Sequence, residues 1–297
     1  MSNPRVIIDT DPGLDDAVAI LFALGSGRFD VLGLTTVAGN IGLDRTTANA
    51  LGLLAVAGRG DIPVLMGAER PLRRWGIDVV AIHGSDGLGG ITLPPPLVTP
   101  QTGAVEWMAR QLRDNPAGTI DILALGPLTN IARLVADHPD AAKRLGRLII
   151  MGGTVDEPGN VGPRSEFNFA SDPEATAIVL QGGLTPTIVP LDVTRRVRAD
   201  MDYVNALRGT MHGDVTAQVL EAYLQDGKQS RPLHDPCVML LALAPDLFDI
   251  ETRMLSVDLS DGADAGALQP NPNGSPVACA LRVDVPGALA LLKTGFV

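Results

Sequence analysis

The chain has 297 residues, 45% of them hydrophobic, and a formal net charge of −11. Nucleic acid is not expected as a partner, because phosphate binding needs a basic face. No apolar run approaches the roughly 18 residues that span a bilayer, and no long apolar signal segment opens the chain. The two cysteines are too few for a disulfide framework. We expect a cytoplasmic protein with no membrane partner.

In chain order, short apolar runs alternate with longer stretches that are typical of helices. Continuous Val, Ile and Leu predict strands at 6–9, 31–37, 121–125, 147–151, 187–190 and 278–283. Helices are predicted between and after them at 15–24, 43–57, 129–136, 172–181 and 238–244. Segment 94–100 is interpreted as a surface connection, and segment 260–276, rich in Gly, Asp, Asn and Pro, as a loop.

This alternation predicts an α/β fold with an open, mostly parallel central sheet and helices on both faces. It resumes after segment 94–100, and the chain contains no internal repeat. We therefore expect a single domain over residues 1–297.

Four carboxylates stand within eight residues, where the first predicted strand gives way to the first helix: Asp9, Asp11, Asp15 and Asp16. Close carboxylates disfavour one another's ionised form, so a cation is expected among them. Ligands of such sheets bind beyond the carboxyl ends of the strands. The oxygen-rich surroundings favour Ca²⁺, whereas Zn²⁺ prefers more His and Cys.

A series of motifs carries a family resemblance: DTDPGLDDA, TTVAGN, ALGPLTN, MGG, SEFNFASDPEA and HDPC, in that order. The series resembles the inosine-uridine-preferring nucleoside N-ribohydrolase family, from about residue 5 to the C-terminus. The resemblance implies the open α/β fold of that family, assembled as a homodimer or homotetramer. It also implies hydrolysis of the N-glycosidic bond of ribonucleosides, with an oxocarbenium-like transition state.

The resemblance also implies roles for individual residues. One Ca²⁺ per subunit would be held by the side chains of Asp11, Asp16 and Asp235 and by the backbone carbonyl of Leu125. Asp11 would also be the general base for the Ca²⁺-bound water, and His234 would protonate the leaving base. The remaining matched residues would contact the substrate: Asp15, Asn40, His83, Met151, Asn160, Glu166 and Asn168.

Taken singly, these residues have ordinary structural interpretations. Asp9 can cap a turn, Asp15 and Asp16 are typical acids of a first helical turn, and Asp235 before Pro236 is a typical N-cap. The functional interpretation rests on the set.

Two other functions stay open from the residues. One is a phosphohydrolase of the haloacid dehalogenase type, although no lysine stands where the phosphate would need it. The other is a non-catalytic, Ca²⁺-dependent nucleoside-binding protein. Release of ribose, release of phosphate, or binding without turnover would distinguish them. The preferred nucleobase is also open, with Tyr223, Gln229 and Arg231 as candidate contacts.

Overall fold

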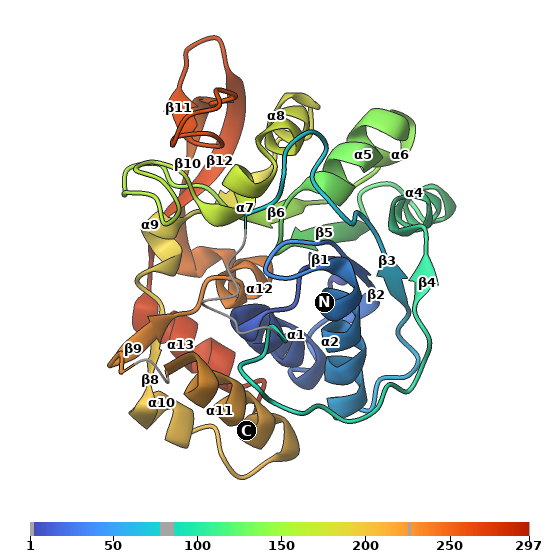
Figure 1. The fold of residues 1–297 in the computed structure, drawn as a ribbon, viewed down its shortest axis with the longest axis vertical. Coiled ribbons are helices and arrows are strands. Elements are labelled where there is room, and N and C mark those ends of the chain that lie inside the picture. Colours follow the sequence, from blue (N-terminus) through green and yellow to red (C-terminus); the bar gives the residue numbers. More distant parts are fainter. Residues whose placement is uncertain (1–2, 78–85, 225–226, 297) are drawn as a thin grey trace.

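A ten-stranded sheet crosses the molecule and carries helices on both faces (Figure 1). The arrangement comes from a computed structural model, which describes residues 3–77, 86–224 and 227–296. The strand order is β11-β10-β12-β7-β6-β5-β1-β2-β3-β4. The α/β fold with a mostly parallel sheet, predicted from the alternation of apolar runs, is confirmed.

Most of the strands run parallel, as the continuous apolar runs indicated. They are β1 (Arg5–Thr10), β2 (Asp30–Thr36), β3 (Val64–Met66), β4 (Gln101–Thr102), β5 (Ile120–Ala124), β6 (Leu148–Met151), β7 (Thr187–Val189) and β12 (Ser275–Val283). At one edge, β10 (Phe248–Val257) lies antiparallel between β12 and β11 (Leu268–Pro270). A separate antiparallel pair is formed by β8 (Arg198–Asp200) and β9 (Ser230–Pro232).

The sheet separates two hydrophobic cores, since successive side chains of a strand point to opposite faces. In β1, Val6 and Ile8 belong to one core and Ile7 to the other. The first core contains residues of α1 (Leu14–Gly25), α2 (Leu43–Val56), α11 (Met211–Leu224), α12 (Pro236–Leu243) and α13 (Val285–Lys293). The second contains residues of α4 (Ala104–Asp114), α5 (Thr129–Asp137), α6 (Pro139–Ala142) and α8 (Pro173–Gln181).

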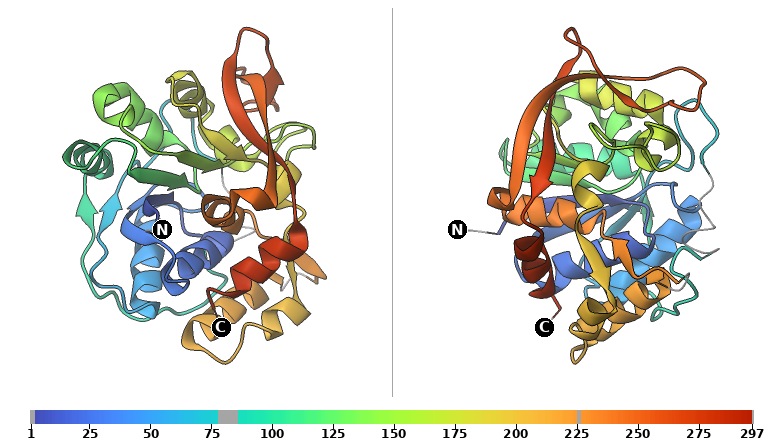
Figure 2. Two further views of the ribbon diagram at one scale, coloured as in Figure 1. Left: turned by 180° about the vertical axis from the view of Figure 1, so that it is seen from behind. Right: turned by 90° about the vertical axis from the view of Figure 1, so that its left-hand side faces the viewer.

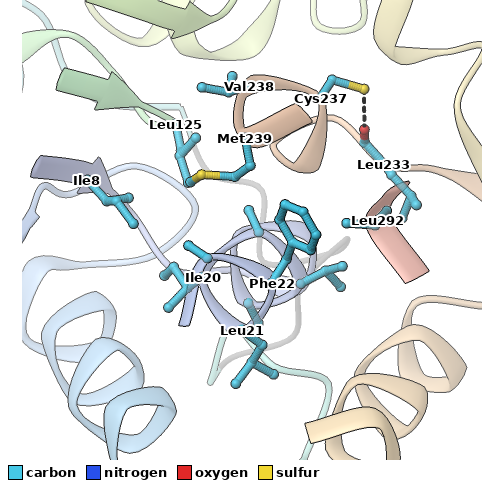
Figure 3. Packing of buried hydrophobic residues seen from close by; sticks show 14 of the residues in the cluster. Ile8, Ile20, Leu21, Phe22, Leu125, Leu233, Cys237, Val238, Met239 and Leu292 are labelled. Carbon is cyan, nitrogen blue, oxygen red and sulfur yellow. Dashed lines mark hydrogen bonds between the residues drawn. The ribbon is translucent and has the colours of Figure 1, made fainter. Parts of the chain in front are cut away.

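Helix α1 lies within the first core and is almost wholly buried. Figure 3 shows Phe22 of α1 close to Leu292 of α13, with Met239 of α12 above the helix. A helix that is apolar on nearly all sides is typical of a protein interior. The acids at the start of α1 therefore stand on a rigid support.

Short helices complete the carboxyl side of the sheet and the periphery: α7 (Phe167–Ser171), α9 (Leu191–Thr194), α10 (Met201–Asn205) and the 3₁₀ helix η1 (Pro245–Leu247). Segment 94–100 is a largely exposed connection, as expected. Among the described residues, no helix has the length and apolar character needed to cross a membrane.

The interpretation of 260–276 as a loop was wrong in part. It contains β11 and the first residues of β12. These strands and β10 form an arm that projects beyond the helices (Figure 2). Most side chains of β10 and two of the three in β11 are exposed or half-buried, so these two strands lack the apolar run or alternation by which buried strands are recognised.

Candidate active site

The candidate site lies where four neighbouring parallel strands end: β2, β1, β5 and β6. In a parallel sheet these carboxyl ends share one edge, which is where ligands bind. Segments distant in sequence thereby bring their residues together: Asp11, Asn40, Leu125 and Met151. The acids of α1 and α12 meet them at the same edge.

Asp16 is fixed by the turn in which it stands. Its Oδ1 accepts a hydrogen bond from the Thr10 hydroxyl at 2.6 Å. Its Oδ2 accepts from the Gly13 N–H at 3.0 Å, as in a capping box, and from Asn40 Nδ2 at 3.1 Å. These hydrogen bonds stabilise the turn between β1 and α1 and fix the orientation of the Asp16 carboxylate.

Asp11 is also buried and closely surrounded. Its Oδ2 accepts from the Asn40 N–H at 2.7 Å, and its backbone carbonyl accepts from Asn40 Nδ2 at 3.1 Å. A Cβ at Gly39 would lie 2.1 Å from Oδ2, and one at Gly126 would lie 2.3 Å from Oδ1. Glycine at both positions leaves the room that this carboxylate occupies. Among the described residues, the buried Oδ1 has no hydrogen-bond partner.

Three other carboxylates approach one another closely. One oxygen from each of Asp15, Asp16 and Asp235 lies within 4.8 Å of the other two. Asp235 stands at the N-cap position of α12, but its side chain accepts no capping hydrogen bond. Its carboxylate is therefore available to the cluster, which contains Asp15 where Asp11 was expected.

The pKa values of these acids reflect their crowding. Burial, and then the charge of Asp16, raise the pKa of Asp11 well above its usual range and that of Asp15 to about 7. The pKa of Asp235 is also raised, by burial first and then by the charges of Asp15, Asp16 and Asp11. A cation would offset both penalties. These oxygen donors, with the free Asp11 oxygen among them, suit a hard divalent ion.

The Asp9 side chain binds neighbouring elements, β2 and α5, and does not cap the turn after β1. Its Oδ1 accepts hydrogen bonds from Thr35 of β2 at 2.5 Å and from Asn130 of α5 at 2.8 Å. Burial raises its pKa to about 6. Asn130 also accepts from the Ala68 N–H at 2.8 Å, so Asp9 helps join β1 to the segment after β3.

A pocket opens above the acids. It is lined by Asp15, Asn40, Leu125, Met151, Asn160, Val161, Glu166, Phe167, Asn168, Tyr223, His234 and Asp235. Most residues predicted for the substrate are thus brought together, while Asp11 and Asp16 are buried and accept hydrogen bonds from the lining residue Asn40. His83 lies outside the described residues.

The segment around α7 forms one wall of the pocket. Asn168 Nδ2 donates to the Leu125 carbonyl at 2.6 Å and to the Met151 carbonyl at 3.1 Å. Glu166 caps α7 by accepting from the N–H groups of Asn168 and Phe169, and it also accepts from the Gly153 N–H at 2.9 Å. Burial raises the pKa of Glu166 to about 7 despite these bonds, which lower it.

His234 and Tyr223 line the same pocket. His234 Nδ1 lies 2.7 Å from the Thr194 hydroxyl. The Arg231 guanidinium lies 5.0 Å from the centre of the Tyr223 ring, a cation–π contact, and its Nε donates to the Tyr223 carbonyl at 2.7 Å.

Two lining residues, Val161 and Phe167, were not predicted at the site, and a third, Tyr223, was predicted only as a candidate contact to the base. Phe167 stands between the predicted residues Glu166 and Asn168, so its neighbours were the available signal. The sequence did not indicate where Tyr223 would lie relative to the base. Val161 carries no polar atom on its side chain, and nothing in its own residue type marks it.

Comparisons with known proteins identify the family of the chain. Residues 6–290 match the family described as "Inosine-uridine preferring nucleoside hydrolase". The chain is 40% identical over 262 residues to the pyrimidine-specific ribonucleoside hydrolase RihA of Citrobacter koseri, covering 85% of this chain and 83% of that protein.

Solved structures give the same result. The plant nucleoside hydrolase PpNRh1 superposes with a TM-score of 0.88 at 34% identity, covering 99% of this chain and 98% of that one. The purine-preferring ribonucleoside hydrolase of Gardnerella vaginalis superposes with a TM-score of 0.91 at 26% identity, covering 98% of both chains.

The fold and the acidic pocket define an N-glycosyl hydrolase of nucleosides, and the chain belongs to the inosine-uridine preferring nucleoside hydrolase family. It hydrolyses ribonucleosides to ribose and free base. This membership favours the hydrolase over the phosphohydrolase and the non-catalytic binding protein.

Proposed function

We propose that ribonucleoside hydrolysis in this protein depends on Asp11 as the general base. The observation that carries the proposal is the hydrogen bonding of this carboxylate. Oδ2 is held by the Asn40 N–H, while the buried Oδ1 has no partner among the described residues. A carboxylate held by one oxygen and free at the other can accept a proton from water without changing its position.

The same acids are proposed to hold one Ca²⁺ per subunit, through Asp11, Asp16, Asp235 and the Leu125 carbonyl. The cluster of buried acids and the metal dependence of the family support a metal, and the all-oxygen donors favour calcium. When bound, the ion supplies Lewis-acid polarisation of water and of the ribose hydroxyls. It also compensates the charges that burial penalises.

The other pocket residues are proposed to hold the ribose and to stabilise the positive charge that develops on it. As the N-glycosidic bond breaks, the sugar becomes oxocarbenium-like. Fixed carboxylate and amide oxygens aimed at a developing charge lower the barrier. The residues assigned to this role are Asp15, Asn40, Asn160, Glu166 and Asn168, with Met151 as an apolar contact beneath the ring.

His234 is proposed to protonate the leaving base. Its Nδ1 lies beside the Thr194 hydroxyl, and the residue lines the pocket. A nucleobase leaves poorly as an anion, and an imidazole is a suitable general acid near neutral pH.

A preference for pyrimidine nucleosides is proposed from the relatives. RihA, at 40% identity, is named as pyrimidine-specific, whereas the neighbour named as purine-preferring is 26% identical. We expect kcat/KM for uridine and cytidine to exceed that for inosine.

A substrate panel tests the proposed function. Free ribose should be released from uridine, the release should stop after chelation, and Ca²⁺ should restore it. A site built around hydroxyl groups rejects the analogue lacking one by roughly 10⁴-fold or more, so 2′-deoxyuridine should be a poor substrate. Equal kcat/KM for uridine and 2′-deoxyuridine would contradict the proposed grip on the ribose, and full activity in chelator would contradict the metal.

A further inference from the structure

The short helix α9 stands between two parts of the site. It follows β7, whose carboxyl end lies at the same edge of the sheet as those of β5 and β6. On one side it contacts the segment 154–160 that leads to Asn160, and on the other it contacts His234. None of its residues lines the pocket.

Asp192 of α9 accepts hydrogen bonds from the segment 154–157. Its Oδ1 accepts from the N–H groups of Asp156 at 2.7 Å and Glu157 at 3.2 Å. Its Oδ2 accepts from the Val155 N–H at 2.9 Å and from the Thr154 hydroxyl at 3.2 Å. One buried carboxylate thereby satisfies three consecutive backbone donors, which would otherwise have to be paired elsewhere.

Arg195, the C-cap residue of α9, binds the same segment nearer the pocket. Its guanidinium donates to the carbonyls of Pro158 at 2.7 Å and Gly159 at 2.8 Å. The next residue is Asn160, whose Oδ1 accepts from the Phe167 N–H at 2.9 Å. The backbone is therefore held from residue 154 to the residue that lines the pocket.

Thr194 makes the second contact. Its side chain is fully buried, and its hydroxyl lies 2.7 Å from His234 Nδ1. A hydroxyl can donate to a neutral ring nitrogen or accept from a protonated one. It therefore fixes the orientation of the ring of His234, which lines the pocket.

We infer that Asp192 and Thr194 are positioning residues, through which α9 sets the ribose-contacting segment and the His234 ring in one fixed relation. The inference rests on the proposed roles of Asn160 and His234. Asp192 positions the segment that contacts the ribose, and Thr194 positions His234, which is proposed to protonate the leaving base. Two neighbours on one helix should therefore have different kinetic signatures.

Asp192→Asn keeps one oxygen but replaces the other with a donor that faces backbone donors. The segment 154–160 should lose its fixed position, and KM should rise roughly tenfold, because the segment must then be ordered on binding. The rise should be similar for uridine and for p-nitrophenyl riboside, since both carry the sugar. Asp156→Asn is the matched control, because it removes an exposed carboxylate from the same segment and keeps the backbone donor. It should leave KM unchanged.

Thr194→Val keeps the shape of the side chain and removes the hydroxyl, whereas Thr194→Ser keeps the hydroxyl. The Val variant should lower kcat for uridine by up to about 10²-fold, which is the cost of misplacing a reacting group by about 1 Å. It should change kcat for p-nitrophenyl riboside much less, because nitrophenolate leaves without a proton. The Ser variant should restore the rate with uridine.

The His234→Ala variant distinguishes a failure of the proposed acid role from a failure of the positioning role. Thr194→Val should reproduce the substrate pattern of His234→Ala at a smaller size. If His234→Ala slows both substrates equally, the proposed acid role fails, but a matching pattern in Thr194→Val still supports positioning. Equal losses of kcat with both substrates in Asp192→Asn and Thr194→Val, in a pattern unlike His234→Ala, would show that α9 is merely structural. Unchanged kinetics in both variants would also overturn the inference.

Discussion

At the scale of single residues, the two oxygens of Asp11 have different environments. The Asn40 N–H donates to Oδ2, and a substitution that keeps an oxygen at this position can keep that hydrogen bond. In Asp11→Asn the amide oxygen can remain there while the free position becomes an amide nitrogen, which cannot accept a proton. General base catalysis contributes roughly 10²- to 10⁴-fold, so kcat/KM for uridine and for p-nitrophenyl riboside should both fall by at least 10²-fold.

Circular dichroism and calcium content serve as controls for Asp11→Asn, because a misfolded or metal-free variant would also be slow. A folded, calcium-loaded variant that keeps its activity within about tenfold of wild type would show that another group accepts the proton.

The neighbouring acids Asp15 and Asp16 allow a matched comparison for the metal. Both are buried at the start of α1, and both belong to the group of close oxygens. Only Asp16 is proposed as a ligand. Asp16→Asn should purify with much less calcium than wild type, whereas Asp15→Asn should keep its calcium and lose affinity for the nucleoside. Elemental analysis of the purified variants measures this directly. Loss of calcium in Asp15→Asn with retention in Asp16→Asn would reverse the assignment.

At the scale of elements, the segment after β2 is shaped around the Asp11 carboxylate. An alanine Cβ at Gly39 would lie 2.1 Å from Asp11 Oδ2 and 2.7 Å from Pro127 Cδ, so one of these groups must shift. Gly39→Ala should therefore lower kcat/KM by roughly 10²-fold, as expected for a displaced reacting group. Gly42→Ala is the control, since a Cβ there meets nothing within 4 Å and its φ of −63° suits alanine. Similar kinetics in the two variants would show that the close approach is unimportant.

The elements also show what the sequence could predict. The turn between β1 and α1 was predictable because its causes are local: an apolar strand, a Pro-Gly turn and first-turn acids. The role of Asp192 was not, because its partners at 154–157 are distant in sequence and are mostly backbone groups. Thr194 was missed for the same reason, since its contact with His234 crosses 40 positions.

At the scale of the whole molecule, the sheet unites segments from residue 5 to residue 283. The single domain, the homodimer or homotetramer and the cytoplasmic location all remain predictions. Light scattering of the purified protein measures the assembly. A monomer in solution with full activity would contradict the oligomer implied by the family resemblance.

Global stability should depend on pH through Glu166. Burial raises the pKa of its carboxyl from 4.5 to about 7 in the folded protein. Between these values the folded state holds a proton that the unfolded state has lost, so the free energy of unfolding falls as pH rises. A difference of this size corresponds to roughly 3 kcal/mol. Glu166→Gln cannot titrate, although it loses one acceptor for the backbone donors at residues 153, 168 and 169 and should be less stable at pH 5.

The advantage of wild type over Glu166→Gln should therefore be largest near pH 5 and should shrink by roughly 2 kcal/mol or more by pH 8. Urea unfolding of both proteins in chelator at each pH measures this difference, and titrations common to the two proteins cancel. An advantage that stays constant or grows with pH would show that the carboxyl is already ionised at pH 5. In that case the three backbone donors that it accepts from, and not its burial, would govern its charge.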